Sequence, residues 1–205
     1  MKLLRIPFWE RSTEASGNLP FHAIDAQPWG QVMDCNASVA VFHYGTGLCL
    51  HYSVRERFIK ARKRRYNKDT FRDNCVEFFI AFNEEADYYN FELNCLGSIK
   101  AAFGPSRDKR DFLPPHHLGR MEENLEITIS NVARDHFIQW DIRIDLDVNT
   151  FCFHRFESLA GVQAVVNFTK CGDELPNPHY LSWVDIQSAT PDFHQPAFFG
   201  EALFV

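Results

Sequence analysis

Two glutamates in neighbouring strand-like segments are the residues best placed to do chemistry. Glu77 lies within residues 73–82 and Glu92 within residues 88–95, with a short polar turn between the segments. Both segments alternate apolar and polar residues, a pattern typical of half-buried strands. If they pair as a hairpin with their apolar residues inward, Glu77, Glu92 and Asn94 share one outer surface, because successive strand side chains point to opposite faces. That surface is a candidate binding face.

The two carboxylates have a catalytic and a structural interpretation. As a pair, Glu77 and Glu92 could serve as the acid and base of a glycoside hydrolase, which needs two carboxyl groups beside the bond it cleaves. As structural residues, they would face water on the open side of an antiparallel sheet. Like charges directly opposite one another destabilise a sheet, so we expect the two side chains to be offset, or bound to a cation or to hydroxyl groups.

Other common catalytic signatures are absent from the sequence. It contains no phosphate-binding loop, no Gly-x-Gly-x-x-Gly and no Gly-x-Ser-x-Gly, which argues against nucleotide chemistry and serine hydrolysis. The nine histidines are scattered apart from the pair His116 and His117. Adjacent side chains on a strand point apart, so we predict no transition-metal site. The basic stretch 55–72 is interpreted as a solvated loop or short helix.

Composition limits the partners and the compartment. The formal net charge of −6 opposes binding to nucleic-acid phosphates. No apolar run reaches membrane-spanning length, and the apolar stretch at the start is broken by Arg5, Pro7 and Glu10. We therefore predict a soluble protein without a signal peptide, cytoplasmic by default, with export left open. The six cysteines are dispersed and are interpreted as free buried thiols, although their even number leaves disulfides open.

Short strands are the elements that must position these residues. The 20 Phe, 4 Trp and 6 Tyr residues favour strands with aromatic packing. The spacing predicts an all-β fold, an antiparallel β-sandwich of the jelly-roll or immunoglobulin-like kind, in a single domain over residues 1–205 with residues 1–36 as an irregular lead-in. The expected strands cover residues 38–44, 48–54, 73–82, 88–95, 98–103, 125–129, 137–144, 162–168, 180–184 and 201–205.

Two loop phenylalanines are candidate ligand contacts. Phe71 comes just before the first hairpin strand, and Phe193 precedes the closing strand. An exposed aromatic ring among polar groups suits the apolar face of a sugar, whose C–H bonds meet the π-face. The alternative is that both rings only cap the core.

Several ordered blocks resemble family 9 carbohydrate-binding modules. Asp73-Asn-Cys-Val-Glu-Phe-Phe-Ile80 and Tyr88-Tyr-Asn-Phe-Glu-Leu-Asn-Cys95 resemble the family's Asp-Ser-Val-Glu-x-Phe-Ile signature and its partner strand. The resemblance covers roughly residues 35–205 and rests on the ordered set of blocks rather than on one of them. Further blocks similar to the family's later strands and closing region are Trp140-Asp-Ile-Arg-Ile144, Val166-Asn-Phe168, Leu181-Ser-Trp183 and Pro191–Gly200.

The resemblance implies a β-sandwich related to the DOMON-like folds, a non-catalytic module that holds a sugar between two aromatic rings. By position, the rings would be Phe71 and Phe193, with polar contacts from Glu77 and Asn94. The family's rings are typically tryptophans, and Glu92 stands where the family has an arginine. These departures concern the ligand rather than the fold.

The same resemblance bears on cofactors. Some members of the family bind structural calcium, for which Asp69, Asp73 and Glu77 would supply carboxylate oxygens here. The loops show no recognisable calcium-binding spacing. We therefore predict no cofactor, with structural calcium as the alternative.

The sequence thus favours a non-catalytic carbohydrate-binding protein without nucleic-acid or membrane partners. A mono- or oligosaccharide would lie in a cleft flanked by Phe71 and Phe193, with Glu77, Glu92 and Asn94 below it. Two alternatives stay open: a glycan-active hydrolase that uses Glu77 and Glu92 as its carboxylate pair, and a protein-interaction domain that has lost sugar binding, since fold does not fix function.

Overall fold

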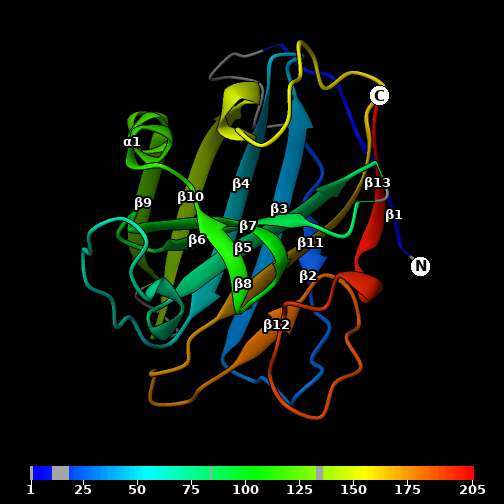
Figure 1. Ribbon diagram of the computed structural model, residues 1–205. Helices are drawn as coiled ribbons and strands as arrows, with labels where there is room; N and C mark the ends of the chain where they lie inside the picture. Colours follow the sequence, from blue (N-terminus) through cyan, green and yellow to red (C-terminus); the bar gives the residue numbers. More distant parts are fainter. Residues whose placement is uncertain (1, 11–18, 84, 133–135) are drawn as a thin grey trace.

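The computed structural model describes residues 2–10, 19–83, 85–132 and 136–205 and is built mainly from β-strands (Figure 1). A nine-residue helix, α1 (Pro115–Glu123), and the short 3₁₀ helices η2 (Thr70–Arg72), η3 (Val148–Thr150) and η4 (Pro196–Phe198) lie between strands. The strands are β1 (Leu3–Ile6), β2 (His22–Ile24), β3 (Cys35–His43), β4 (Gly47–Glu56), β5 (Cys75–Phe82), β6 (Tyr88–Asn94), β7 (Ile99–Ser106), β8 (Lys109–Phe112), β9 (Leu125–Val132), β10 (Phe137–Asp147), β11 (Gln163–Cys171), β12 (Tyr180–Ser182) and β13 (Gly200–Phe204).

The strands form two sheets that pack against each other. The eight-stranded sheet has the order β1-β13-β11-β5-β6-β7-β8, with β12 also paired to β11, and the five-stranded sheet has the order β2-β3-β4-β10-β9. Among the strand pairs of the described residues, β1 with β13 is parallel and the others are antiparallel. The predicted antiparallel β-sandwich is therefore confirmed.

Alternation in β5 and β6 turns their apolar residues toward the opposite sheet. Phe78 is fully buried, and its ring stacks at 5.3 Å from Phe168 and at 6.1 Å from Phe91. Burying one such ring contributes about 1.5–3 kcal/mol. Tyr52 of the other sheet donates its hydroxyl to the carbonyl oxygen of Glu77 at 2.8 Å. These contacts fix the inner face of the hairpin and so fix the direction of its outer face.

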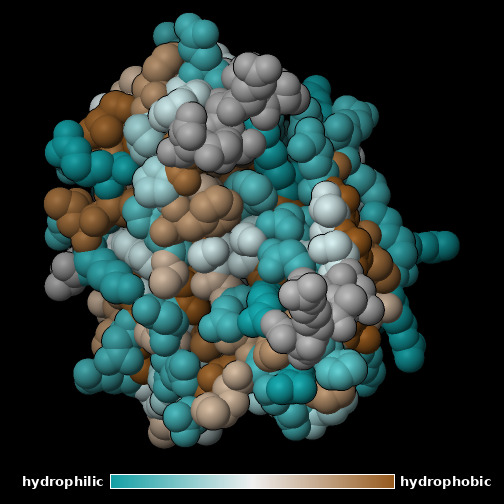
Figure 2. Space-filling model, turned by 180° about the vertical axis from the view of Figure 1, so that it is seen from behind, coloured by the Kyte–Doolittle hydropathy of each residue, from teal (hydrophilic) through white to brown (hydrophobic). Residues whose placement is uncertain are grey.

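The five-stranded sheet follows the same rule. In β10, Trp140 and Ile142 are fully buried, whereas Gln139 and Asp141, which alternate with them, are half-exposed. Seen from behind, the surface of the molecule is mostly hydrophilic, with hydrophobic residues in scattered groups (Figure 2). The residues alternate as the sequence pattern predicted, because one face of this sheet forms core and the other meets water.

Two stretches predicted to be irregular contain regular elements. The lead-in over residues 1–36 contributes β1 and β2, which are only four and three residues long and therefore too short to show alternation. The segment around His116 and His117, for which no strand or helix was predicted, contains β8 and then α1. This helix buries only Leu118 and Met121, so its helical periodicity in the sequence is weak. Among the described residues, none of the helices is both long and apolar enough to cross a lipid bilayer.

The outer face of the β5–β6 hairpin is covered, although the sequence predicted an open surface. The basic stretch that follows β4 folds back over it and is held there by polar residues. Asp73 binds the Arg64 guanidinium at 2.9 Å and accepts the Arg62 N–H at 3.2 Å. The Asn74 side chain accepts the Lys60 N–H at 2.7 Å. These contacts cover one end of the hairpin. Further along it, Phe71 of η2, Arg107 and Arg110 and residues 191–194 enclose the predicted surface, which becomes the floor of a cavity.

Candidate functional site

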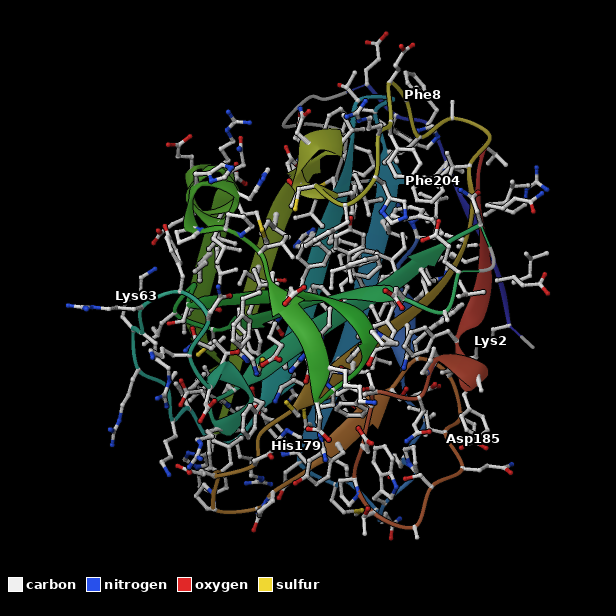
Figure 3. All side chains as sticks on the ribbon, viewed as in Figure 1. Lys2, Phe8, Lys63, His179, Asp185 and Phe204 are labelled. Carbon is white, nitrogen blue, oxygen red and sulfur yellow. The ribbon has the colours of Figure 1, made fainter. Side chains whose placement is uncertain are left out.

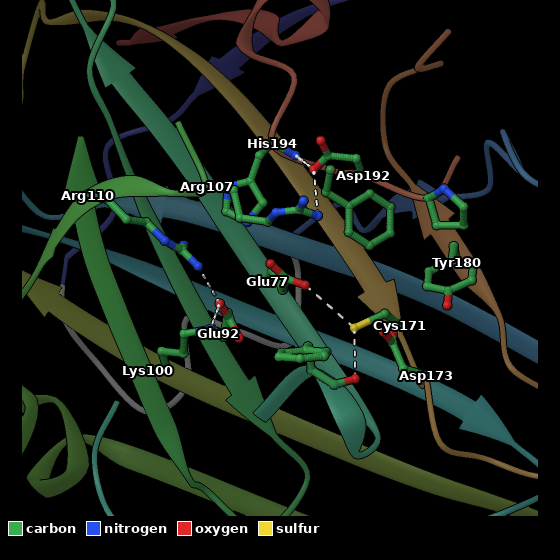
Figure 4. Close-up of a pocket in the computed structure, with 13 residues that line it drawn as sticks. Glu77, Glu92, Lys100, Arg107, Arg110, Cys171, Asp173, Tyr180, Asp192 and His194 are labelled. Atoms are coloured by element: carbon green, nitrogen blue, oxygen red, sulfur yellow. Dashed lines mark hydrogen bonds and ion pairs between the residues drawn. The ribbon is translucent and has the colours of Figure 1, made fainter. Parts of the chain in front are cut away.

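A cavity of about 280 Å³ lies over the outer face of β5, β6, β7 and β11 (Figure 4). Four of the five residues predicted for a ligand site line it: Phe71, Glu77, Glu92 and Phe193. They come from η2, the central hairpin and the segment before β13, so long-range pairing of strands brings them together. The fifth residue, Asn94, is not among the lining residues.

Glu77 and Glu92 face each other directly across the hairpin, so they are not offset along the strands. The solvated interpretation is wrong as well, because the two residues are 5% and 2% exposed. Glu92 instead has the cation and hydroxyl partners that were the other expectation. Its carboxylate lies 2.9 Å from the Lys100 ammonium and accepts the Thr70 hydroxyl at 2.9 Å.

The environment of Glu77 favours its neutral form. Burial, followed by the negative charge of Glu92, raises the pKa of Glu77 to about 8. One of its carboxylate oxygens accepts the Asn90 side-chain N–H at 3.0 Å, and the other lies 3.5 Å from the Cys171 thiol. A carboxyl group with this pKa is mostly protonated at neutral pH and can donate a hydrogen bond to a ligand.

Two arginines that line the cavity, Arg107 and Arg110, add positive charge. Arg110 of β8 lies 3.6 Å from the Glu92 carboxylate and donates to the Asn90 side-chain oxygen at 2.5 Å. Arg107 is about half exposed and lies 3.9 Å from Asp192. In Figure 4, Arg110, Lys100 and Glu92 occupy one side of the cavity, with Asp173 and Tyr180 on the other. The site therefore offers both signs of charge rather than a uniform field.

The sequence could have revealed one of these residues but not the others. Lys100 lies in a predicted strand and pairs directly with Glu92, so alternation places it on the same outer face. Arg110 lies in β8, which was not predicted, and His194 lies in an irregular segment. Burial and the nearby arginines lower the pKa of His194 to about 2, so its ring is neutral. Its position in the cavity depends on tertiary contacts, such as the hydrogen bond to the Tyr88 hydroxyl at 2.8 Å.

The two aromatic candidates differ in how far they are free to meet a ligand. Phe71 is half-buried, with the Lys100 ammonium 5.2 Å from its ring centre. Phe193 is 6% exposed and packs on Trp29 at 5.4 Å and on Tyr180 at 6.2 Å. Both rings line the cavity. Because Phe71 is less buried, its ring is the more accessible to a ligand, whereas Phe193 forms part of a buried wall.

Asn94 has a structural role in place of the predicted ligand contact. Its side chain donates to the Arg62 carbonyl oxygen and to Asp73, both at 2.8 Å. Its oxygen accepts the backbone N–H groups of Leu96 at 3.1 Å and Ser98 at 2.8 Å. The register explains the difference, because Asn94 pairs with Cys75 at the end of the hairpin, under the folded-back basic stretch.

Two of the three carboxylates considered for calcium, Asp69 and Asp73, already have arginine partners. Asp69 lies 3.2 Å from Arg72, and Asp73 forms the ion pair with Arg64. Burial by itself would raise the pKa of Asp73. The hydrogen bonds from the Arg64 guanidinium and the Asn94 amide favour the charged form and together outweigh burial, so the pKa of Asp73 is lowered. A carboxylate that is neutralised by arginine is a poor ligand for a cation.

Comparisons with known proteins identify the family and support the fold. The sequence model of carbohydrate-binding family 9 matches residues 13–204. The structure of a candidate carbohydrate-binding protein from Bacteroides uniformis ATCC 8492 is similar over 100% of this chain and 99% of its own, with 29% identity and a TM-score of 0.87.

More distant structures share the fold. A family 9 carbohydrate-binding module from Caldicellulosiruptor kristjanssonii, solved with cellotriose and with glucose, matches 98% of this chain at 11% identity and a TM-score of 0.62, covering 93% and 95% of those chains. A search of curated proteins finds no match. Because the family model spans nearly the whole chain, the protein belongs to carbohydrate-binding family 9.

Proposed function

We propose that this protein binds a mono- or oligosaccharide non-covalently in the cavity over the β5–β6 hairpin. The observation that carries the proposal is the composition of the cavity: aromatic rings of Phe71, Tyr180 and Phe193 lie beside the hydrogen-bonding groups of Glu77 and Arg110. Sugars need both, because their C–H faces stack on rings while their hydroxyls require polar partners. Family membership and the sugar complexes of the Caldicellulosiruptor module support the same class of ligand.

The size of the cavity favours a small ligand or the end of a chain. Its volume of about 280 Å³ is at the lower end of small-molecule sites, which span roughly 300–1,000 Å³. One or two sugar rings are therefore the natural occupants. The half-exposed Arg107 at the rim can contact a further unit.

The chemistry of the floor supports binding rather than turnover. Both carboxylate oxygens of Glu92 are engaged by the protein, one by Lys100 and Arg110 and the other by Thr70, so neither is free to act on a substrate. Glycosidases require one carboxyl that gives up its proton and a second that acts as base or nucleophile. A hydrolase remains the second candidate, because two buried glutamates line one cavity.

Isothermal titration against a sugar panel tests the proposal. We expect binding that weakens about tenfold in Phe71→Ala, since loss of one stacked ring costs about 1–1.5 kcal/mol. Phe8→Ala is the matched control, because Phe8, labelled at the top of Figure 3, is exposed and does not line the cavity. If the folded wild-type protein binds no sugar of a broad panel, the proposal is overturned and a protein-interaction domain is favoured.

The hydrolase alternative has its own readout. Turnover of a chromogenic glycoside by the wild-type protein, lost in Glu77→Gln, would replace binding with catalysis as the function. We expect no turnover in either protein, and unchanged sugars after long incubation by chromatography.

A further inference from the structure

Two thiols and a carboxylate converge next to the floor of the cavity: Glu77 and Cys171 line it, and Cys75 is fully buried beside them. Cys75 and Glu77 are two residues apart on β5 and therefore share a face, and Cys171 of β11 is the direct cross-strand partner of Cys75. One ligand atom from each of the three residues lies within 4.8 Å of the others. Three different positions of the chain thus present soft and hard donors to one point.

The separation of these atoms is close to that of a tetrahedral metal site. With metal–sulfur bonds near 2.3 Å and metal–oxygen bonds near 2.0–2.2 Å, neighbouring ligand atoms are about 3.3–3.8 Å apart. The Cys171 sulfur already lies 3.5 Å from the nearer Glu77 oxygen. Small side-chain rotations would complete the geometry without moving the strands.

The surroundings leave the required atoms available and orient them. Asn90 donates to one Glu77 oxygen at 3.0 Å, which leaves the other oxygen directed at Cys171. The Thr169 hydroxyl, opposite Glu77 in register, is fully buried and lacks a hydrogen-bond partner among the described residues. A hydrogen bond such as the one from Asn90 holds a ligand in the orientation that a metal needs.

A second cluster of the same kind shows what disqualifies a site. Cys35, Glu56 and His179 also come within 4.8 Å of one another. The Lys170 ammonium, however, lies 3.1 Å from Glu56 and 2.9 Å from His179. A protein cation already occupies the position that a metal would take there.

We propose that Cys75, Cys171 and Glu77 bind a thiophilic divalent cation of the zinc type at the floor of the cavity. Two thiolates select such an ion over calcium or magnesium, which prefer oxygen ligands. Binding forms two metal–sulfur bonds and one metal–oxygen bond and releases three protons to solvent, one from each thiol and one from the Glu77 carboxyl group. Glu77 and Cys171 line the cavity, so the fourth coordination position faces it and is open to water or, resting on the function proposed above, to a sugar hydroxyl.

Cobalt titration of the chelator-treated protein tests the site, because cobalt bound by thiolates absorbs through sulfur-to-metal charge transfer. We expect one equivalent of cobalt to produce this absorption and zinc to abolish it by displacement. Cys75→Ser and Cys171→Ser should lose the absorption, and Glu77→Gln should weaken zinc binding by at least about tenfold. Cys152→Ser, a half-buried cysteine outside the cluster, is the matched control and should behave as wild type.

A measurement on the wild-type protein covers the case in which a cysteine variant fails to fold. X-ray absorption at the zinc edge should count two sulfur ligands; none or one would overturn the proposal. So would the absence of cobalt–thiolate absorption in folded wild-type protein, or its persistence in a folded Cys171→Ser variant. Sugar titrations of the metal-free protein are a separate readout, so failure of sugar binding and failure of the metal site are distinguishable.

Discussion

Replacement of Lys170 by methionine should strongly destabilise the fold. Lys170 is 0% exposed, and its ammonium lies 3.1 Å from the Glu56 carboxylate, itself 1% exposed. The ammonium also lies 2.9 Å from the His179 ring and donates to the Cys171 carbonyl oxygen at 2.8 Å. Methionine has a similar apolar stem, so the variant removes the charge and its hydrogen bonds while leaving much of the packing in place.

The magnitude follows from what the variant leaves behind. Glu56 would keep its hydrogen bond from the Trp140 indole at 2.6 Å but would be a buried carboxylate without a counter-charge. Breaking a buried ion pair from one side typically costs about 3–5 kcal/mol. We expect a loss of this size for Lys170→Met, against less than about 0.5 kcal/mol for methionine at the exposed Lys68.

Urea denaturation followed by tryptophan fluorescence measures the loss as a lower midpoint at an unchanged slope. Combining Lys170→Met with Glu56→Gln should cost less than the sum of the two single variants, because the second change removes the stranded charge. A loss below about 1 kcal/mol in Lys170→Met, or strict additivity in the double variant, would refute this account of the buried pair.

Three further predictions follow from the polar interior. Burial, then the Lys170 charge, lowers the pKa of His179 to about 4, so the folded state disfavours protonation, and stability present above the ordinary pKa of 6.5 is lost as pH falls from 6.5 toward 4. The free energy of unfolding should therefore decrease more between pH 7 and pH 4.5 in the wild type than in His179→Gln. Equal decreases in the two proteins would contradict this prediction. Glu92→Gln should cost about 3 kcal/mol in denaturation, because it leaves Lys100 and Arg110 buried without their carboxylate; a neutral effect would show that the pair is not desolvated. Asn94→Ala removes four hydrogen bonds and should lower the free energy of unfolding by about 2–4 kcal/mol. The sugar affinity of the folded variant should equal that of the wild type. A loss of affinity without loss of stability would instead place Asn94 in the ligand site.

Local patterns predicted the central hairpin well. Alternation over residues 73–82 and 88–95 depends on neighbours in sequence, because a strand must send successive side chains to opposite faces. The resulting order of strands and the family resemblance located Phe71, Glu77, Glu92 and Phe193, all of which line the cavity. What failed was the prediction of an open, hydrated outer face.

That failure has one cause, which is that burial of a face depends on segments distant in sequence. Residues after β4 cover one end of the hairpin, and the segment with His194 encloses the cavity from near the C-terminal end of the sequence. Nothing in residues 73–95 alone distinguishes a solvated glutamate from a buried one. The same holds for Lys170 and Glu56, which are 114 positions apart and meet only when β11 and β4 lie in opposing sheets.

The sequence by itself determined the strands other than β1, β2 and β8, the sandwich and the family, because periodicity and ordered motifs are local properties of the chain. The tertiary structure decided which strands become neighbours and what covers them. Those neighbours set the pKa of Glu77, the partners of Glu92 and the convergence of Cys75 with Cys171. The physical reason is that charge states and ligand geometry depend on distances through space, which are set when strands pair, sheets pack and loops fold over them.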